Sequence, residues 1–202
     1  AERGRGQRAC EELAHAVRLS DSRARPDSLQ LGQAYRNLGR AMIGVGDLPG
    51  ARAMYARAAE VQERSLGDMH SELATTLYLS AMAASEAGDY VAQRRVAERA
   101  LAIRERVFGR DHPVVAIAAA TLGNAIRNLG DPEGALPYYE RSLAIHRAAA
   151  RPNPFDLSLA LNNLGSALLQ TRDGAGARKY LEEAREVRAR AFGPGSGTGV
   201  WA

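Results

Sequence analysis

The chain has 202 residues, 46% of them hydrophobic, and a net charge of +4, so it is long enough to bury a core in one large or two small domains. It contains no apolar run of eighteen residues, no signal-peptide pattern and no lipidation motif, which argues against a membrane protein and predicts a soluble, cytoplasmic one. The one cysteine, Cys10, cannot form an internal disulfide, and because no motif surrounds it we expect an inert thiol.

The first predicted element is a helix over residues 7–19, followed by a polar turn over 20–27. Its apolar residues recur at helical spacing and align with the second helix of each later repeat. The chain therefore opens on a half-repeat, and we expect either a fragment of a longer protein or an N-terminal face that something else covers. The residues that carry this pattern are Ala9, Leu13, Ala16 and Leu19.

From residue 28 onward the sequence repeats every 42 residues, and each repeat reads as two amphipathic helices. The predicted pairs are 28–45 with 48–66, 70–87 with 90–108, 112–129 with 132–149, and 155–171 with 174–191. Helix pairs that recur at such a period form a solenoid, in which each pair covers the apolar face of its neighbour. We predict a single solenoid over 1–192 and a flexible Gly-rich tail over 193–202.

A Gly-Asp step separates the two helices of most pairs, at Gly46, Gly88 and Gly130, with Arg172 in place of Gly in the last. Gly ends a helix readily, and the Asp that follows it can accept backbone N–H groups of the next helix. Within the first helices, Gly39, Gly123 and Gly165 recur, with Ala81 in the second repeat. Because Gly costs about 1 kcal/mol inside a helix, we expect the partner helix to approach closely there.

The repeat resembles the longer form of the tetratricopeptide repeat, as found in kinesin light chains and in many bacterial tandem-repeat proteins. That resemblance implies an all-α, right-handed superhelical solenoid of antiparallel helix pairs, whose concave groove is lined by the first helices and binds an extended or helical peptide. It implies a scaffold or adaptor for protein partners and not an enzyme. The segments that carry it are 100–105, 108–116, 161–165, 46–51 and 130–135.

Polar residues lie opposite the buried stripe of each first helix. Asn is unfavourable inside a helix, because its side chain competes for backbone hydrogen bonds, so the repeated Asn needs an explanation. Asn can both donate to and accept from a peptide backbone, and Arg pairs with carboxylates. The predicted peptide-binding groove consists of Arg36, Asn37, Arg40, Tyr78, Met82, Asn124, Arg127, Asn128, Asn162, Asn163 and Ser166.

Alternatively, these are ordinary solvent-facing residues, and the Asn before Leu-Gly serves helix packing. We favour the groove, in which Arg36, Arg40 and Arg127 would select acidic residues of a partner. Tyr78 and Met82 would then form an apolar pocket between two basic ends. Equally, Met82 could simply fill space in the Ala-rich second repeat.

The sequence predicts no metal site, no cofactor and no catalytic residues. His70 and His112 occur in equivalent turns, one period apart, so we expect them to be structural turn residues. His15 and His146 have no carboxylate or Cys at ligand spacing. The Gly-rich tail lacks the Lys-Ser/Thr of a phosphate loop, and no nucleophile elbow or paired-acid motif is present.

Three other functions are compatible with the sequence. A regulatory or sensor segment of a larger signalling protein would explain the opening half-repeat. Nucleic-acid binding through Arg is less favoured, because Arg alternates with Glu along the helices and no single face is basic. Self-association through uncapped end repeats is the third.

Overall fold

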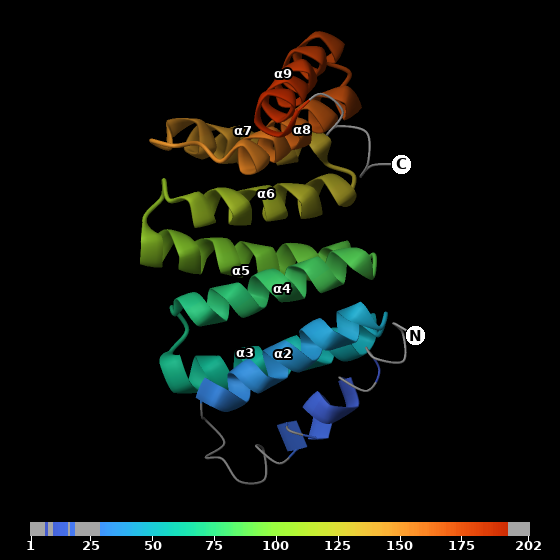
Figure 1. Ribbon diagram of the computed structural model, residues 1–202, viewed down its shortest axis with the longest axis vertical. Helices are drawn as coiled ribbons and strands as arrows, with labels where there is room; N and C mark the ends of the chain where they lie inside the picture. The colour runs from blue at the N-terminus through green and yellow to red at the C-terminus, as the bar shows by residue number, and fades with distance from the viewer. Residues whose placement is uncertain (1–6, 8–9, 16, 19–28, 194–202) are drawn as a thin grey trace. The chain divides into compact units, whose positions relative to one another are not determined.

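The computed structural model describes residues 7, 10–15, 17–18 and 29–193, and in that part of the chain every regular element is an α-helix (Figure 1). All the predicted helix pairs are present, and each helix ends within one residue of its predicted end. The predicted turn at 20–27 and the tail after Gly193 lie outside the described residues. The helices are α2 (Leu29–Gly44), α3 (Leu48–Leu66), α4 (Ser71–Glu86), α5 (Tyr90–Phe108), α6 (Pro113–Asn128), α7 (Pro132–Ala148), α8 (Pro154–Gln170) and α9 (Gly174–Phe192).

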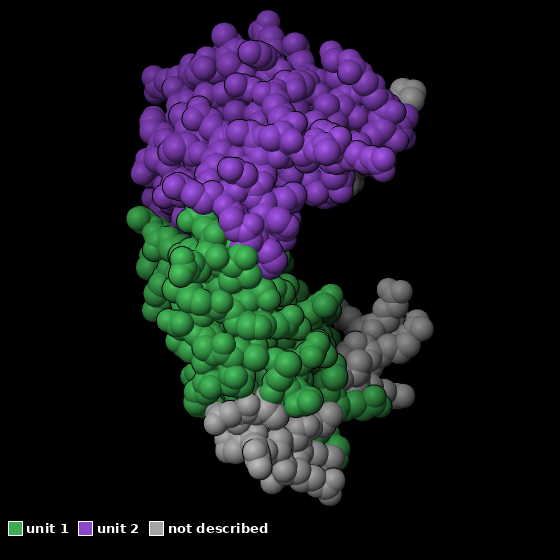
Figure 2. Space-filling view, turned by 90° about the vertical axis from the view of Figure 1, so that its left-hand side faces the viewer, with its two compact units in different colours: residues 1–107 green, residues 108–202 purple. Residues whose placement is uncertain are grey.

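The helices belong to two compact units, residues 1–107 and 108–202 (Figure 2). In the first unit α2 packs on α3 and α3 on α4, and a buried cluster that includes Leu73 and Ile103 joins α4 to α5. In the second unit α6 packs on α7, α7 on α8, and α8 on α9. Each unit thus contains two consecutive helix pairs. The predicted single solenoid over 1–192 stays a prediction.

The predicted half-repeat is helical at its described residues within 7–18. Val17 is buried there, and Cys10 and Leu13 pack with it against the cluster formed by α2 and α3. Ala9, Ala16 and Leu19, which the sequence selected as its apolar face, lie outside the described residues. The segment therefore covers one face of the first helix pair, as the repeat pattern predicts.

The Gly-Asp steps form the predicted helix caps. The carboxylates of Asp47, Asp131 and Asp173 accept the N–H of the residue three positions later, at 2.9, 2.8 and 2.9 Å, and Asp89 does the same at 3.0 Å. The residue before each Asp is left-handed, with φ of 83°, 71° and 92° at the three glycines. Arg172 adopts φ 66° at the fourth step, where a side chain is strained.

The recurring glycines lie where the second helix of the pair comes close, as predicted. A Cβ on Gly39 or Gly123 would lie 2.9 Å from the ring of Tyr55 or Tyr139, respectively. On Gly165 it would lie 2.7 Å from Leu181. In the second repeat Ala81 stands at the position of the glycine and Ala97 at the position of the tyrosine. The small and the large residue of the contact therefore change together. The glycine therefore makes room for a large side chain of the partner helix.

Histidine begins two of the first helices. The Nδ1 atoms of His70 and His112 accept the N–H groups of Glu72 and Val114 at 3.2 and 3.3 Å, which makes both residues helix N-caps. Asn153 does this for α8, accepting the N–H of Phe155 at 2.9 Å. The predicted structural role of the histidines is confirmed. Pro154 starts α8 one residue earlier than predicted, because Pro is well suited to the first helical position.

Candidate functional site

The first helices lie beside one another within each unit: α2 beside α4, and α6 beside α8. We call the surfaces that these two pairs present the first-helix faces of units 1 and 2. Every predicted groove residue is at least partly exposed: Asn37, Arg40 and Met82 are exposed, and the others are half-buried. The face of unit 1 carries Arg36, Asn37, Arg40, Tyr78 and Met82, and that of unit 2 carries Asn124, Arg127, Asn128, Asn162, Asn163 and Ser166.

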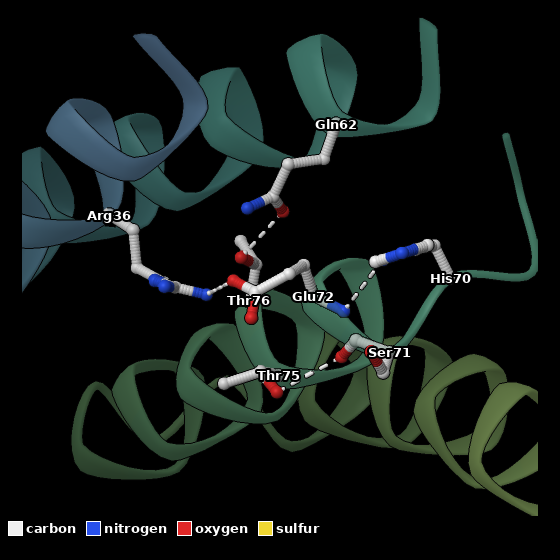
Figure 3. Close-up of polar contacts among 7 residues, drawn as sticks. All are labelled: Arg36, Gln62, His70, Ser71, Glu72, Thr75 and Thr76. Atoms are coloured by element: carbon white, nitrogen blue, oxygen red, sulfur yellow. Dashed lines mark hydrogen bonds and ion pairs between the residues drawn. The ribbon is translucent and has the colours of Figure 1, made fainter. Parts of the chain in front are cut away.

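Arg36 is held inside the protein. Its guanidinium donates to Glu72 of α4 at 2.6 Å, and its side chain is only 12% exposed (Figure 3). In the same region the hydroxyl of Thr76 donates to the buried side-chain oxygen of Gln62 at 2.7 Å (Figure 3). These contacts join α4 to the preceding pair. Arg36 therefore positions the helices, and its charge is already neutralised by Glu72.

Tyr78 is covered on one side. The guanidinium carbon of Arg104 in α5 lies 5.0 Å from the centre of the Tyr78 ring, a cation–π arrangement. Arg104 is buried, and burial lowers its pKa, while the nearby Tyr78 acts in the opposite direction. Tyr78 thus helps to hold a buried cation, which limits the ring surface that it can offer to a ligand.

Asn124 is engaged with the second helix of its own pair. Its side-chain oxygen accepts the hydroxyl of Tyr139 at 2.8 Å, and Arg127 lies 5.9 Å from the Tyr139 ring. Tyr139 is fully buried, and burial raises its pKa to about 12. The Asn124 oxygen is therefore part of the core, and only its NH₂ group is left to donate to a ligand.

The polar residues of α8 differ from Asn124 in this respect. Asn162, Asn163 and Ser166 are half-buried, and among the described residues none of their side chains makes a hydrogen bond. Each amide offers donors and acceptors at a helix surface. These three residues are the part of the predicted site that is best arranged to bind a peptide backbone.

A depression of about 210 Å³ opens on the first-helix face of unit 1. Met82 lines it, but Tyr78, with which the sequence analysis paired Met82 in an apolar pocket, does not. Its other main lining residues come from three helices: Arg40 and Ile43 of α2, Tyr55 of α3, and Leu79 and Glu86 of α4. Ile43 and Leu79 occupy the repeat positions of Arg127 and Asn163, and the sequence analysis, which selected mainly polar residues at these positions, missed both.

Unit 2 has an apolar patch on its first-helix face that the sequence analysis did not select. Ile117 of α6 and Leu159 of α8 occupy equivalent repeat positions, and they are 36% and 40% exposed. Phe155, one turn before Leu159, is 55% exposed. At the repeat position of Ile117 and Leu159, unit 1 carries the polar residues Gln33 and Thr75. Comparison of repeats at this position would have revealed the difference.

Two family models, both described as tetratricopeptide repeat, match the sequence, one over residues 72–148 and the other over 31–72 and 158–196. The chain belongs to the tetratricopeptide-repeat family. These matches cover both units and agree with the helix pairs of the structure. No curated protein matches the sequence.

Several solved structures share the fold of this tetratricopeptide-repeat chain. The nearly identical TPR-like repeats assigned to a kinesin light chain of Podosopora anserina match with a TM-score of 0.82 and 20% identity, covering 94% of this chain and 89% of that one. BtubC (BKLC) from P. vanneervenii matches with a TM-score of 0.84 and 22% identity, covering 100% and 80%. The predicted kinesin-light-chain-like type and the all-α, tetratricopeptide-type solenoid class are confirmed.

A Rap protein complexed with competence and sporulation factor is a more distant match, with a TM-score of 0.66 and 16% identity, covering 90% of this chain and 53% of that one. At these identities the structures show a common fold. The tetratricopeptide repeat is in general a fold of protein-interaction scaffolds. None of the helices within the described residues is long and apolar enough to span a membrane.

Proposed function

We propose that the chain is a non-enzymatic scaffold that binds a peptide segment or partner domain on its first-helix faces. The observation that carries this proposal is the set of half-buried amide and hydroxyl side chains on α8, Asn162, Asn163 and Ser166, which have no hydrogen-bond partner among the described residues. Asn in a helix interior normally competes with the backbone, so a helix gains nothing from two adjacent, unengaged Asn residues. A peptide main chain would satisfy both.

The charges of the protein support a protein partner over a nucleic acid. Many of the arginines are paired with carboxylates, within 2.6 to 3.3 Å, including Arg52 with Asp89, Arg99 with Glu63 and Arg147 with Glu183. Phosphate binding needs unpaired cations on one face. The regulatory-segment proposal from the sequence is compatible with a scaffold and concerns only what the scaffold is attached to.

Capture from a native lysate tests the proposal. The immobilised protein is compared with Asn162→Ala/Asn163→Ala and with a control, Glu182→Ala/Arg185→Ala, which changes two exposed residues of α9. We expect the wild type to capture a discrete protein that stays bound after nuclease treatment and at moderate salt. The Asn162→Ala/Asn163→Ala protein, called the α8 variant below, should lose this captured protein, and the control should retain it. Retention of nucleic acid alone, or equal retention of the protein by both variants, would contradict the proposal.

A further inference from the structure

The depression on the first-helix face of unit 1 has the size of an anchor site for one side chain. Its volume of about 210 Å³ is well above that of a single water, yet below the roughly 300–1,000 Å³ of pockets that hold whole small-molecule ligands. Ile43, Leu79 and Met82 form its apolar surface, and Met82 is 41% exposed. An aliphatic side chain placed here would remove this apolar surface from water.

The hydroxyl of Tyr55 lacks the partner that its equivalent in the third repeat has. Tyr139 donates its hydroxyl proton to the side-chain oxygen of Asn124. The residue of the first repeat that corresponds to Asn124 is Arg40, and a guanidinium contains only donors, so it cannot accept the hydroxyl proton of Tyr55. Tyr55 is 2% exposed and lines the depression, and no described residue accepts its hydroxyl proton. The hydroxyl of Tyr55 is therefore available to donate to an acceptor of a ligand bound in the depression.

Two opposite charges border the depression. Burial is the main effect that raises the pKa of Tyr55, and of the two rim charges Arg40 acts to lower it and Glu86 to raise it. Both charges therefore act on the same hydroxyl. Arg40 and Glu86 are exposed, and neither forms an ion pair with another described residue. A ligand that carries only acidic groups would meet repulsion from Glu86.

We propose that this depression anchors a peptide segment of the partner in which an aliphatic residue, such as Leu or Met, lies between an acidic residue that pairs with Arg40 and a basic residue that pairs with Glu86. A backbone carbonyl of the segment accepts the Tyr55 hydroxyl. This inference rests on the proposed scaffold function and makes it more specific. It also adds a basic residue to the acidic residues of a partner that the sequence analysis expected.

Labelled heptapeptides test the charge pattern by fluorescence anisotropy. In an extended chain, alternate side chains face the same way, so the charges are placed two residues from the central Leu. The probes contain Glu-Ser-Leu-Ser-Lys, the reverse order Lys-Ser-Leu-Ser-Glu, a version with Glu on both sides, and each mixed order with Gly in place of Leu. The protein is used as the wild-type chain and as the charge-swapped variant Arg40→Glu/Glu86→Arg, with circular dichroism as the check of folding.

We expect one mixed order to bind the wild type more tightly than the other by about 4- to 25-fold, since each exposed ion pair contributes roughly two- to fivefold. The swapped variant should prefer the opposite order, and Gly in place of Leu should weaken binding by about tenfold or more. Tightest binding of the doubly acidic peptide, the same preferred order in both proteins, or no binding of either mixed peptide would overturn the inference.

The two proposals fail in different ways. If no mixed peptide binds but the α8 variant still loses its captured protein, the scaffold stands and the anchor site is wrong. If the peptides behave as expected but the α8 variant retains the captured protein, the anchor site stands and the role of Asn162 and Asn163 is wrong.

Discussion

Replacing Gly123 with Ala should destabilise the protein, although Ala is the better helix former. The substitution gains about 1 kcal/mol of helix propensity. The new Cβ, however, would lie 2.9 Å from Cε1 of Tyr139 and 3.2 Å from two further ring atoms. Overpacking of this kind costs about 1–3 kcal/mol, so we expect a net loss of about 0–2 kcal/mol in the free energy of unfolding.

Gly44 provides the matched control for Gly123. It lies at the exposed end of α2, and a Cβ added there would meet no atom within 4 Å, so Gly44→Ala should stabilise the protein by up to about 1 kcal/mol. With Tyr139→Ala already present, Gly123→Ala should stabilise as well, because the ring is gone. This double variant reproduces the Ala–Ala combination of the second repeat.

Urea unfolding followed by circular dichroism measures all of these variants. The expected coupling between Gly123→Ala and Tyr139→Ala is about 1–3 kcal/mol. If Gly123→Ala and Gly44→Ala stabilised the wild type equally, Tyr139 would have moved at no cost. The close approach of the partner side chain would then not explain the recurring glycine.

Three further predictions concern single residues. Arg172→Gly should stabilise the protein by about 0.5–1 kcal/mol in urea unfolding, because Arg172 has φ 66° where the other repeats have Gly, and a loss would show that its side chain compensates. Burial lowers the pKa of His146, and the nearby Asp156 acts in the opposite direction. The neutral side chain therefore contributes its full stability above the unfolded-state pKa of about 6.5, and this contribution is lost as the pH falls through the folded-state pKa. Between about pH 7 and pH 5 the wild type should therefore lose more stability than His146→Gln, by up to about 1.4 kcal/mol per pH unit, and parallel curves would contradict this. Gln93→Met should raise the midpoint of thermal unfolding, because the buried side-chain oxygen of Gln93 has no hydrogen-bond partner and its removal should stabilise by about 1 kcal/mol; a lower midpoint would mean that the oxygen is satisfied in solution.

The helix pairs and their caps could be predicted because their signals are local. The Asp of each Gly-Asp step needs only an N–H three residues away, and the apolar stripes repeat at 42 residues with little variation. The recurrence of Gly39 and Gly123 likewise indicated a close approach, although only the structure shows that tyrosine rings cause it.

The engagement of individual side chains could not be predicted, since it depends on residues far along the chain. Arg36 and Glu72 are separated by 36 residues, and Asn124 and Tyr139 by 15. The amino-acid types gave no sign that these two groove residues would serve packing while Asn162 and Asn163 remained unengaged. To predict the anchor depression, one would have to compare Arg40 with Asn124, which occupy the same repeat position. That comparison is informative only once the structure shows that Tyr55 and Tyr139 lie next to them.

Contact between the first-helix face and a captured protein is the most direct test of the account. A photoreactive benzoylphenylalanine is placed at Ser166, on the first-helix face of unit 2, and in a separate protein at the exposed Arg185 of α9. After irradiation with the captured protein, we predict a covalent product from position 166 and none from position 185. Crosslinks from position 185 without any from position 166 would contradict the assignment of the binding face.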